Sequence, residues 1–370
     1  MKKWWIVIII ILLAAGAGFG WWWLNGGQEQ FGSAPTDNNP VAAKIYSNFT
    51  GLEISDNSLN SAPTFCVQIP NGSTDGARPQ AGLTHAGVVF EAIAETGITR
   101  FAAIFQAPTT GIIGPIRSLR PYYLGWDTPF DCTIVHDGGS DEALAQLNTG
   151  NYRNLDEDFR YMWKVSDSGR LWNNVFTSPE KLLEFNHAHG YDTSAPQTFP
   201  RLTPDEVITA EFCSTDDDEC DNSADANSIS VKFTNLLDYM VNYTYDPISN
   251  TYLRSYANGD AHLVYNCPAS VTDFSDCGAL TQVAPSVVIA MHVHESTMAD
   301  NYHEEIQYTG EGQAEIFQNG TFTSATWRKP SQTAQIQFFD TEGNEIKFTP
   351  GQIWISAVPQ FGHVEWAVAK

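Results

Sequence analysis

Basic residues are scarce in this chain. The sequence has 19 lysines and arginines against 43 aspartates and glutamates, which gives a formal net charge of −24 at pH 7. A nucleic-acid-binding protein needs a basic face to neutralise phosphates, so this balance argues against nucleic acid as a partner. It argues equally against a folded body that lies flat on an anionic membrane. The simplest interpretation of the excess acid is a solubilising surface.

The sequence also lacks the short motifs of common catalytic and metal sites. It contains no Gly-x-Ser-x-Gly nucleophile elbow, no Walker loop and no dinucleotide-binding fingerprint. No two cysteines have the Cys-x-x-Cys spacing of a zinc knuckle or a thioredoxin-like site. The acidic run 216–219 lacks the spacing of a calcium loop, and His292 and His294 share a strand face without a convincing further ligand. We therefore expect no metal and no cofactor.

A long apolar segment opens the chain. Lys2 and Lys3 precede an uncharged run from Trp4 to Leu24, which as a helix would be about 30 Å long, the thickness of a bilayer's hydrocarbon core. Because lysines precede the run and none follows soon, we expect the rest of the chain outside the cytoplasm. The segment predicts a transmembrane signal anchor at 1–24 and a single-pass protein of the cell membrane with extracytoplasmic domains. A signal peptide cleaved near residues 15–17 is the alternative.

Six cysteines suit an oxidising compartment. Two pairs flank short loops, and a third pair would form if two apolar strands are neighbours. Six cysteines allow fifteen connectivities, so the pairing is a hypothesis. The expected pairs are Cys213 with Cys220, Cys267 with Cys277, and Cys66 with Cys132.

Patterning along the chain predicts an α+β fold. The first folded region mixes helix and strand signals, whereas period-two alternation dominates from Ile229 onward. The expected order is the transmembrane helix at 1–24, a flexible stalk at 25–62, a mixed α/β domain at 63–200, an acidic disulfide-bearing linker at 201–228 and a mostly antiparallel β domain at 229–370.

Local chemistry predicts several elements of the first domain. Two apolar runs, 88–95 and 98–106, flank a Thr-Gly pair and predict a hairpin in which Gly97 adopts a positive φ. Ser140 and Ser178 precede helix-forming segments as N-caps, and a proline at the first helical position follows Ser178. The buried face expected for the second helix consists of Leu182, Leu183 and Phe185.

The most informative stretch joins a Gly-Pro turn to a Gly-Gly turn. Arg117 and Arg120 lie three residues apart, and on one side of a helical turn they could grip a carboxylate or phosphate bidentately. His136 and Asp137 stand at the end of a strand, where α/β folds usually place their sites. An open backbone and a helix N-terminus, both favourable to an anion, follow at once. These positions are Gly138, Gly139 and Ser140.

Two glutamates lie on an otherwise apolar strand. Glu91 and Glu95 are four residues apart and should share a face, with Arg100 across the predicted turn. Buried carboxylates need partners, so one interpretation is a structural Glu95–Arg100 pair, with Arg117 and Arg120 as further buried partners. The other interpretation makes Glu95 a general acid with a raised pKa.

Several segments are similar to those of one bacterial family. They are Arg78-Pro-Gln-Ala-Gly-Leu83, Gly97-Ile-Thr-Arg-Phe101, Gly114-Pro-Ile-Arg-Ser-Leu-Arg-Pro121, Val135-His-Asp-Gly-Gly-Ser140, Tyr252-x-Arg254 and Thr349-Pro-Gly-Gln-Ile-Trp354. Over most of residues 63–360 the chain resembles the YerB-like bacterial lipoprotein family. The resemblance implies a two-domain, exported, membrane-tethered protein, and it implies no activity because the family's function is unknown. The N-terminal segment has no lipobox cysteine, so a protein helix would replace the lipid as anchor.

Two functions fit these observations. The first is an envelope protein that binds or processes an anionic glycan or a phosphate-bearing ligand. Its ligand-binding residues would be Arg100, Arg117, Arg120, Gly138, Gly139 and Ser140, and its catalytic residues His136, Asp137 and Glu95. The second is a non-catalytic envelope scaffold or protein-interaction module, so the sequence leaves open whether the protein is an enzyme. Convergence of Arg117, Arg120 and His136 on an open cleft would favour the first function.

Overall fold

The computed structural model describes residues 44–367 except residues 110, 166–169, 171, 208–225, 269–273 and 275–276. The predicted anchor, much of the predicted stalk and the predicted Cys213–Cys220 pair lie outside the described residues. Among the helices that the structure does describe, none combines the length and apolar character needed to cross a bilayer. Residues 45–370 form one compact unit.

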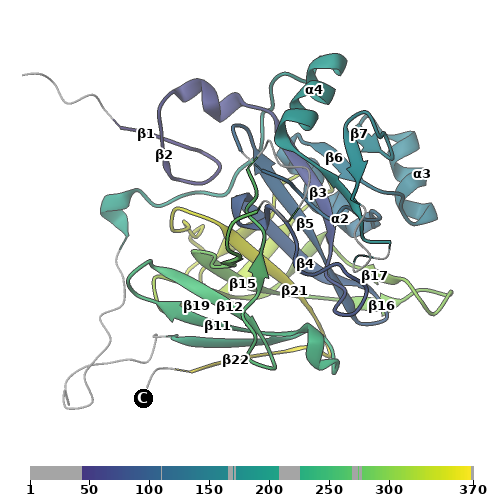
Figure 1. Ribbon diagram of the computed structural model, residues 1–370. Helices are drawn as coiled ribbons and strands as arrows, with labels where there is room; N and C mark the ends of the chain where they lie inside the picture. Colours follow the sequence, from purple (N-terminus) through teal and green to yellow (C-terminus); the bar gives the residue numbers. More distant parts are fainter. Residues whose placement is uncertain are drawn as a thin grey trace, which may run out of the picture. The chain divides into compact units, whose positions relative to one another are not determined.

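A ten-stranded mixed sheet is the centre of this unit (Figure 1). In spatial order its strands are β20 (Gln337–Phe339), β19 (Thr321–Lys329), β18 (Gly310–Gln318), β15 (Val287–Val293), β21 (Ile353–Pro359), β4 (Val88–Glu95), β5 (Ile98–Gln106), β3 (Thr64–Pro70), β6 (Thr133–His136) and β7 (Arg153–Asp156). The strand β21 pairs in parallel with both β15 and β4. One sheet therefore joins strands from the two predicted domains, and the domain boundary itself stays a prediction.

A second sheet has four antiparallel strands in the order β12 (Thr251–Tyr256), β11 (Met240–Asp246), β10 (Ser228–Lys232) and β22 (His363–Ala367). Four two-stranded ladders account for the remaining strands of the described residues. They are β1 (Ile45–Tyr46) with β2 (Glu53–Ile54), β8 (Met162–Lys164) with β9 (Val175–Thr177), β13 (Leu263–Val264) with β14 (Thr281–Gln282), and β16 (Glu295–Thr297) with β17 (Glu304–Ile306). The expected antiparallel pairing holds for these strands of the second half, whereas β21 departs from it.

The helices of the described residues are short. They are α2 (Pro121–Asp127), α3 (Asp141–Thr149) and α4 (Pro179–His189), with 3-10 turns η1 (Asn57–Ser61), η2 (Leu83–His85), η3 (Thr128–Phe130), η4 (Pro204–Glu206) and η5 (Leu237–Tyr239). The Ser140 hydroxyl caps α3 and the Ser178 hydroxyl caps α4, as predicted. The predicted burial of Leu183 is wrong, because its side chain is 39% exposed on the outer face of α4.

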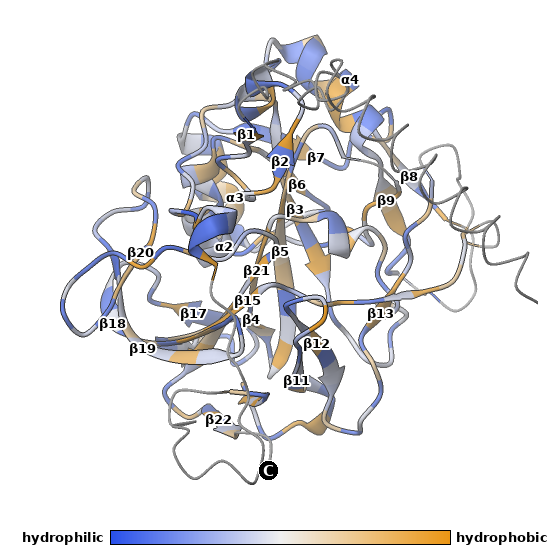
Figure 2. Ribbon diagram, turned by 90° about the vertical axis from the view of Figure 1, so that its left-hand side faces the viewer, coloured by the Kyte–Doolittle hydropathy of each residue, from blue (hydrophilic) through white to orange (hydrophobic). Residues whose placement is uncertain are grey.

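The central strands are buried on both faces. Alternate residues of each strand enter two separate cores. One core includes Val89 and receives α4 and the second sheet, and the other includes Phe90 and receives α2 and α3. Figure 2 shows the resulting apolar character along the central strands. This double burial explains why the strands are nearly continuous apolar runs in the sequence.

Two corrections concern segments without strong periodicity. Residues 45–61, expected in a flexible stalk, carry β1, β2 and η1, because Phe49 is 2% exposed and packs edge-on against Phe130.

Arg117 and Arg120 do not lie on a helical turn. Arg120 is an extended residue just before α2, and the segment that contains Arg117 has no helical assignment.

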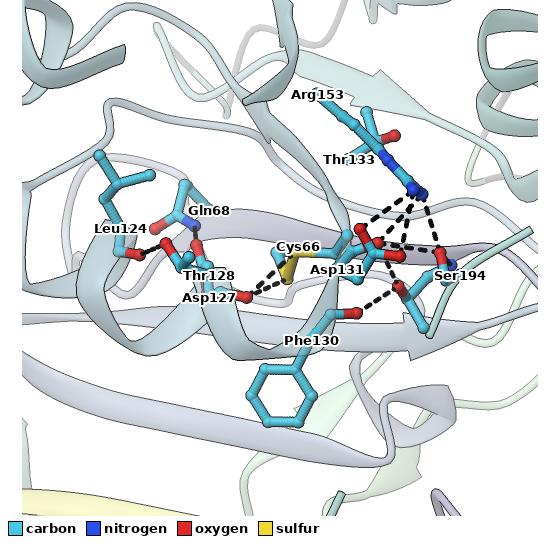
Figure 3. The surroundings of a disulfide bond; sticks show 12 residues. Cys66, Gln68, Leu124, Asp127, Thr128, Phe130, Asp131, Thr133, Arg153 and Ser194 are labelled. Atoms are coloured by element: carbon cyan, nitrogen blue, oxygen red, sulfur yellow. Dashed lines mark hydrogen bonds and ion pairs between the residues drawn. A yellow bond between two sulfur atoms is a disulfide. The ribbon is translucent and has the colours of Figure 1, made fainter. Parts of the chain in front are cut away.

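Two of the predicted disulfides are confirmed. The Cys66–Cys132 bond joins β3 to the start of β6, which is the parallel neighbour of β3 (Figure 3). Nearby, Arg153 pairs with Asp131 at 3.0 Å and also donates to Ser194. The second bond, Cys267–Cys277, closes a loop of ten residues in sequence separation.

Candidate functional site

Three arginines line one cavity of about 470 Å³. Arg100, Arg117 and Arg120 share its wall with Glu95 and Gly139, and we call this cavity the arginine cleft. Other parts of the wall come from residues 71–75, 172–173, 239 and 302–303. Both halves of the sequence therefore contribute to the cleft.

The hairpin β4–β5 places the first two charges. Thr96 and Gly97 have φ values of 47° and 85°, the left-handed conformations of a tight hairpin turn, as predicted for Gly97. The ladder register shifts between Ile93 and Glu95, so Glu95 turns toward the Arg100 side of the sheet. The turn and the bulge together bring a carboxylate and a guanidinium to the same edge of the cleft.

Glu95 is the shared counter-ion of two buried arginines. Its Oε1 accepts from Nη2 of Arg100 at 2.6 Å, and its Oε2 accepts from Nη2 of Arg120 at 3.1 Å. Arg100 also donates to the Ser118 carbonyl, and both guanidinium-bearing residues are only 5% exposed. Two positive charges thus face one negative charge in a setting with little water, where charge interactions are strong.

Arg117 completes the group at the more open side. Its Nη1 lies 3.7 Å from Oδ2 of Asp137, and its side chain is 26% exposed. Burial lowers the pKa of both Arg117 and Arg120, and the positive charge of Arg100 lowers the pKa of each further. Burial is the larger cause of both shifts, and the mutual repulsion of neighbouring guanidinium groups adds to it.

Two donors in the cleft have no partner among the described residues. They are the buried Nε atoms of Arg100 and Arg120. A buried N–H without an acceptor is costly, so the two guanidinium groups are incompletely satisfied inside the fold. An anionic group in the cleft would add charge-assisted interactions with these side chains.

The Gly-Gly segment is divided between structural and site roles. His136 is fully buried, with Nδ1 2.7 Å from the Gly138 carbonyl oxygen and Nε2 2.7 Å from Oδ1 of Asn154. The Gly138 N–H donates to Asp156, and the Ser140 hydroxyl is occupied as the cap of α3. Of the predicted residues from this segment, the structure places Gly139 on the cleft wall and pairs Asp137 with Arg117 of that wall, whereas His136 is not part of the wall.

Glu91 belongs to a different cluster from Glu95. Both of its oxygens accept from Nη2 of Arg254, at 3.0 and 2.9 Å, and Nε1 of Trp354 donates to it. The expectation that Glu91 and Glu95 share a face is wrong, because the register shift falls between them. Sequence reasoning did not predict Arg254 as the partner of Glu91. Its place between Tyr252 and Tyr256 on the buried face of a period-two strand could have indicated a buried charge that needs a partner.

No candidate metal site emerges from the part of the chain that the structure describes. It contains no group of three or more histidine, cysteine or acidic side chains placed to hold an ion. His292 pairs instead with Glu315 at 2.7 Å on the neighbouring strand. No pattern in the sequence predicts that the cleft wall includes Trp172, Tyr239 and Tyr302, because these residues lie in turns without periodic patterning.

Comparisons with known proteins match both halves of the chain. The family model described as "Protein of unknown function (DUF3048) N-terminal domain" matches residues 49–192, and the corresponding C-terminal domain matches residues 229–355. The Bacillus subtilis (strain 168) protein named "Putative lipoprotein YerB" is 28% identical over 324 residues, which cover 86% of this chain and 88% of that protein. The crystal structure of YerB from Bacillus subtilis superposes with a TM-score of 0.67 at 23% identity, covering 87% of this chain and all of that one. At this identity the structural likeness supports the fold alone.

Proposed function

The chain belongs to the two-domain DUF3048 family, as its resemblance to YerB-like proteins predicted. From this premise we propose that it is an extracytoplasmic envelope protein and that it binds an anionic ligand in the arginine cleft. The relative's name as a lipoprotein supports a membrane-associated location. The two disulfides support an oxidising compartment. The apolar segment at 4–24 supplies an anchor of the right length.

The proposal depends on one observation, the convergence of three guanidinium groups on one cavity. Glu95 offsets only part of the charge of Arg100 and Arg120, and Arg117 reaches the open side. In a chain of net charge −24 with only 19 lysines and arginines, such a cluster of guanidinium groups is conspicuous. Planar guanidinium groups suit carboxylate and phosphate oxygens, so we infer a ligand that bears one of these groups.

The geometry favours binding over catalysis. A general acid or base must reach the proton that it transfers. Both ring nitrogens of His136 are engaged inside the fold, and Glu95 is held by two arginines. We therefore assign ligand binding to the cleft and propose no reaction there.

A scaffold without any small ligand is the second candidate. It is favoured by the burial of Arg100 and Arg120 and by their ion pairs with Glu95, since such pairs also occur in purely structural networks. The two candidates differ in whether the cleft binds a free anion.

Calorimetric titration of the Arg117→Gln variant distinguishes them. The probes are inorganic phosphate, glycerol 3-phosphate and glucuronate, titrated into the extracytoplasmic part of the chain. Losing a charge-assisted hydrogen bond should weaken binding roughly tenfold or more. Arg160→Gln is the matched control, because Arg160 pairs with Asp158 at an exposed position outside the cleft. No binding of any probe by the wild type, or equal binding by the Arg117→Gln variant, would reject the proposal.

A further inference from the structure

Two exposed aromatic side chains stand on the wall of the arginine cleft. Trp172 is 59% exposed and Tyr302 is 49% exposed, and both line the same cavity as the three arginines. Large aromatic surfaces left in water are often binding surfaces, because burying them against a ligand is favourable. Trp172 comes from the first half of the chain and Tyr302 from the second.

Arg170 and Asn173, which lie close to Trp172 in sequence, are anchored by their side chains. Arg170 donates to the carbonyls of Gly76 and Pro79, and Nδ2 of Asn173 donates to the Asp75 carbonyl at 2.9 Å. Arg170 and Asn173 are 4% and 1% exposed. These contacts restrain Arg170 and Asn173 on either side of the indole, which lowers the entropy lost when a ligand packs on it.

The turn between β16 and β17 presents Tyr302. Oδ1 of Asp300 accepts from the backbone N–H groups of Tyr302 and His303, and Oδ2 lies 2.6 Å from Nδ1 of His303. These hydrogen bonds lower the pKa of Asp300 to about 2, so its carboxylate stays charged at ordinary pH. An isolated β-bridge between His303 and Glu95 joins the turn to the end of β4, where Glu95 pairs with Arg100 and Arg120.

One residue of the cleft wall, Asn173, also has a buried acceptor without a partner among the described residues. Oδ1 of Asn173 makes no hydrogen bond among the described residues, although Asn173 lines the cavity and is almost fully buried. A carboxylate or fully ionised phosphate has no proton to donate to it, whereas a hydroxyl does. The cleft thus combines guanidinium groups for an anion, aromatic surface for an apolar ring face, and a wall residue whose amide oxygen has an unused capacity to accept from a hydroxyl.

We propose that the ligand is a pyranose sugar carrying a carboxylate or phosphate. Its ring packs on Trp172 and Tyr302, one of its hydroxyls donates a hydrogen bond to Oδ1 of Asn173, and its anionic group lies at the arginines. This proposal rests on the anion-binding function above and specifies its ligand. One face of a pyranose ring presents C–H groups that bury well against an aromatic ring, while its hydroxyls are donors. A nucleotide could also stack on Trp172, and it serves as a competing probe in the test.

The test compares probes with and without a sugar ring. Affinities are measured by calorimetry for glucuronate against acetate, and for glucose 6-phosphate against inorganic phosphate, with uridine monophosphate as the competitor. In Trp172→Ala and Tyr302→Ala we expect the sugar probes to bind about tenfold more weakly, with phosphate and acetate changed less than twofold. Arg117→Gln should weaken the binding of all of these anions.

Two variants serve as controls. Tyr302→Phe should keep sugar binding near the wild-type level. Phe159→Ala replaces an equally exposed aromatic residue outside the cleft and should leave the affinity for every probe unchanged.

The outcomes separate the two proposals. If Arg117→Gln loses binding while Trp172→Ala and Tyr302→Ala bind the sugars as the wild type does, the sugar proposal fails and anion binding stands. Tighter binding of uridine monophosphate than of glucose 6-phosphate also overturns the sugar proposal. If the wild type binds no anion at all, both proposals fall.

Discussion

At the scale of single residues, Glu95 decides how much positive charge the cleft displays. It lies within hydrogen-bond distance of two guanidinium groups and is itself largely buried. Removing one member of a buried charged group leaves the remaining charges without compensation, which costs more than the group contributes when intact. The same carboxylate therefore stabilises the fold and competes with any anion for the arginines.

Replacing Glu95 with Gln should lower the free energy of unfolding by roughly 3 kcal/mol or more, because Arg100 and Arg120 would then repel each other in a buried setting. Added phosphate should recover part of the loss by binding only the folded form. Urea denaturation with and without phosphate measures both effects. The control is Glu365→Gln, which removes a mostly exposed partner of Lys232 and should cost less than about 1 kcal/mol. Equal effects of the two substitutions would contradict this account.

The sequence predicted the local ion pair and missed the distant one. Glu95 and Arg100 flank a recognisable turn, so their proximity follows from the hairpin. The partner of Glu91 is Arg254, which is 163 residues away in sequence, and no local pattern connects them. The bulge after Ile93 is likewise a tertiary feature, and it separates two glutamates that simple alternation places together.

At the scale of elements, the Cys66–Cys132 bond joins β3 to the start of β6 in the central sheet. It closes a segment of 66 residues, whereas Cys267–Cys277 closes only ten. A longer closed loop removes more conformations from the unfolded chain, if the loop-entropy account applies.

The double variant Cys66→Ala/Cys132→Ala should therefore lose about 4 kcal/mol of unfolding free energy, and Cys267→Ala/Cys277→Ala about 3 kcal/mol. Urea melts of the oxidised proteins provide the comparison, and the wild type in reductant should approach the less stable variants. A larger loss from the ten-residue loop than from the long one would show that another effect outweighs loop entropy.

Local chemistry also sets the limit of element prediction. The hairpin β4–β5 and the capped helices α3 and α4 follow from turn residues, caps and apolar periodicity. The position of β21 between β15 and β4 does not, because alternation identifies a strand without naming its neighbours. The aromatic wall of the cleft was missed for the same reason, since its residues come from separate turns that meet only in the folded chain.

At the scale of the whole molecule, the ten-stranded sheet joins the two halves of the chain through continuous strand pairing. Val88 and Ile353 are directly paired, although one belongs to each half. Unfolding either half must break the β4–β21 ladder and expose core residues of the other.

Residues 45–370 should accordingly unfold in a single cooperative transition. Urea midpoints from far-ultraviolet circular dichroism and from tryptophan fluorescence should coincide, because both halves lose their packing together. Calorimetric and van't Hoff enthalpies should agree as well. Two separate midpoints would show that the halves are independent despite their common sheet.

The late position of β21 in the sequence matters for how the polypeptide is made. Both β4 and β15 are synthesised before β21, so each strand has an unpaired edge until Ile353 and the residues after it are available to pair with them. Unpaired edges are templates for pairing with other molecules. A premature stop codon before residue 353 would leave that gap permanently open, and aggregation or degradation by quality-control proteases, rather than a working fragment, is the fate to expect.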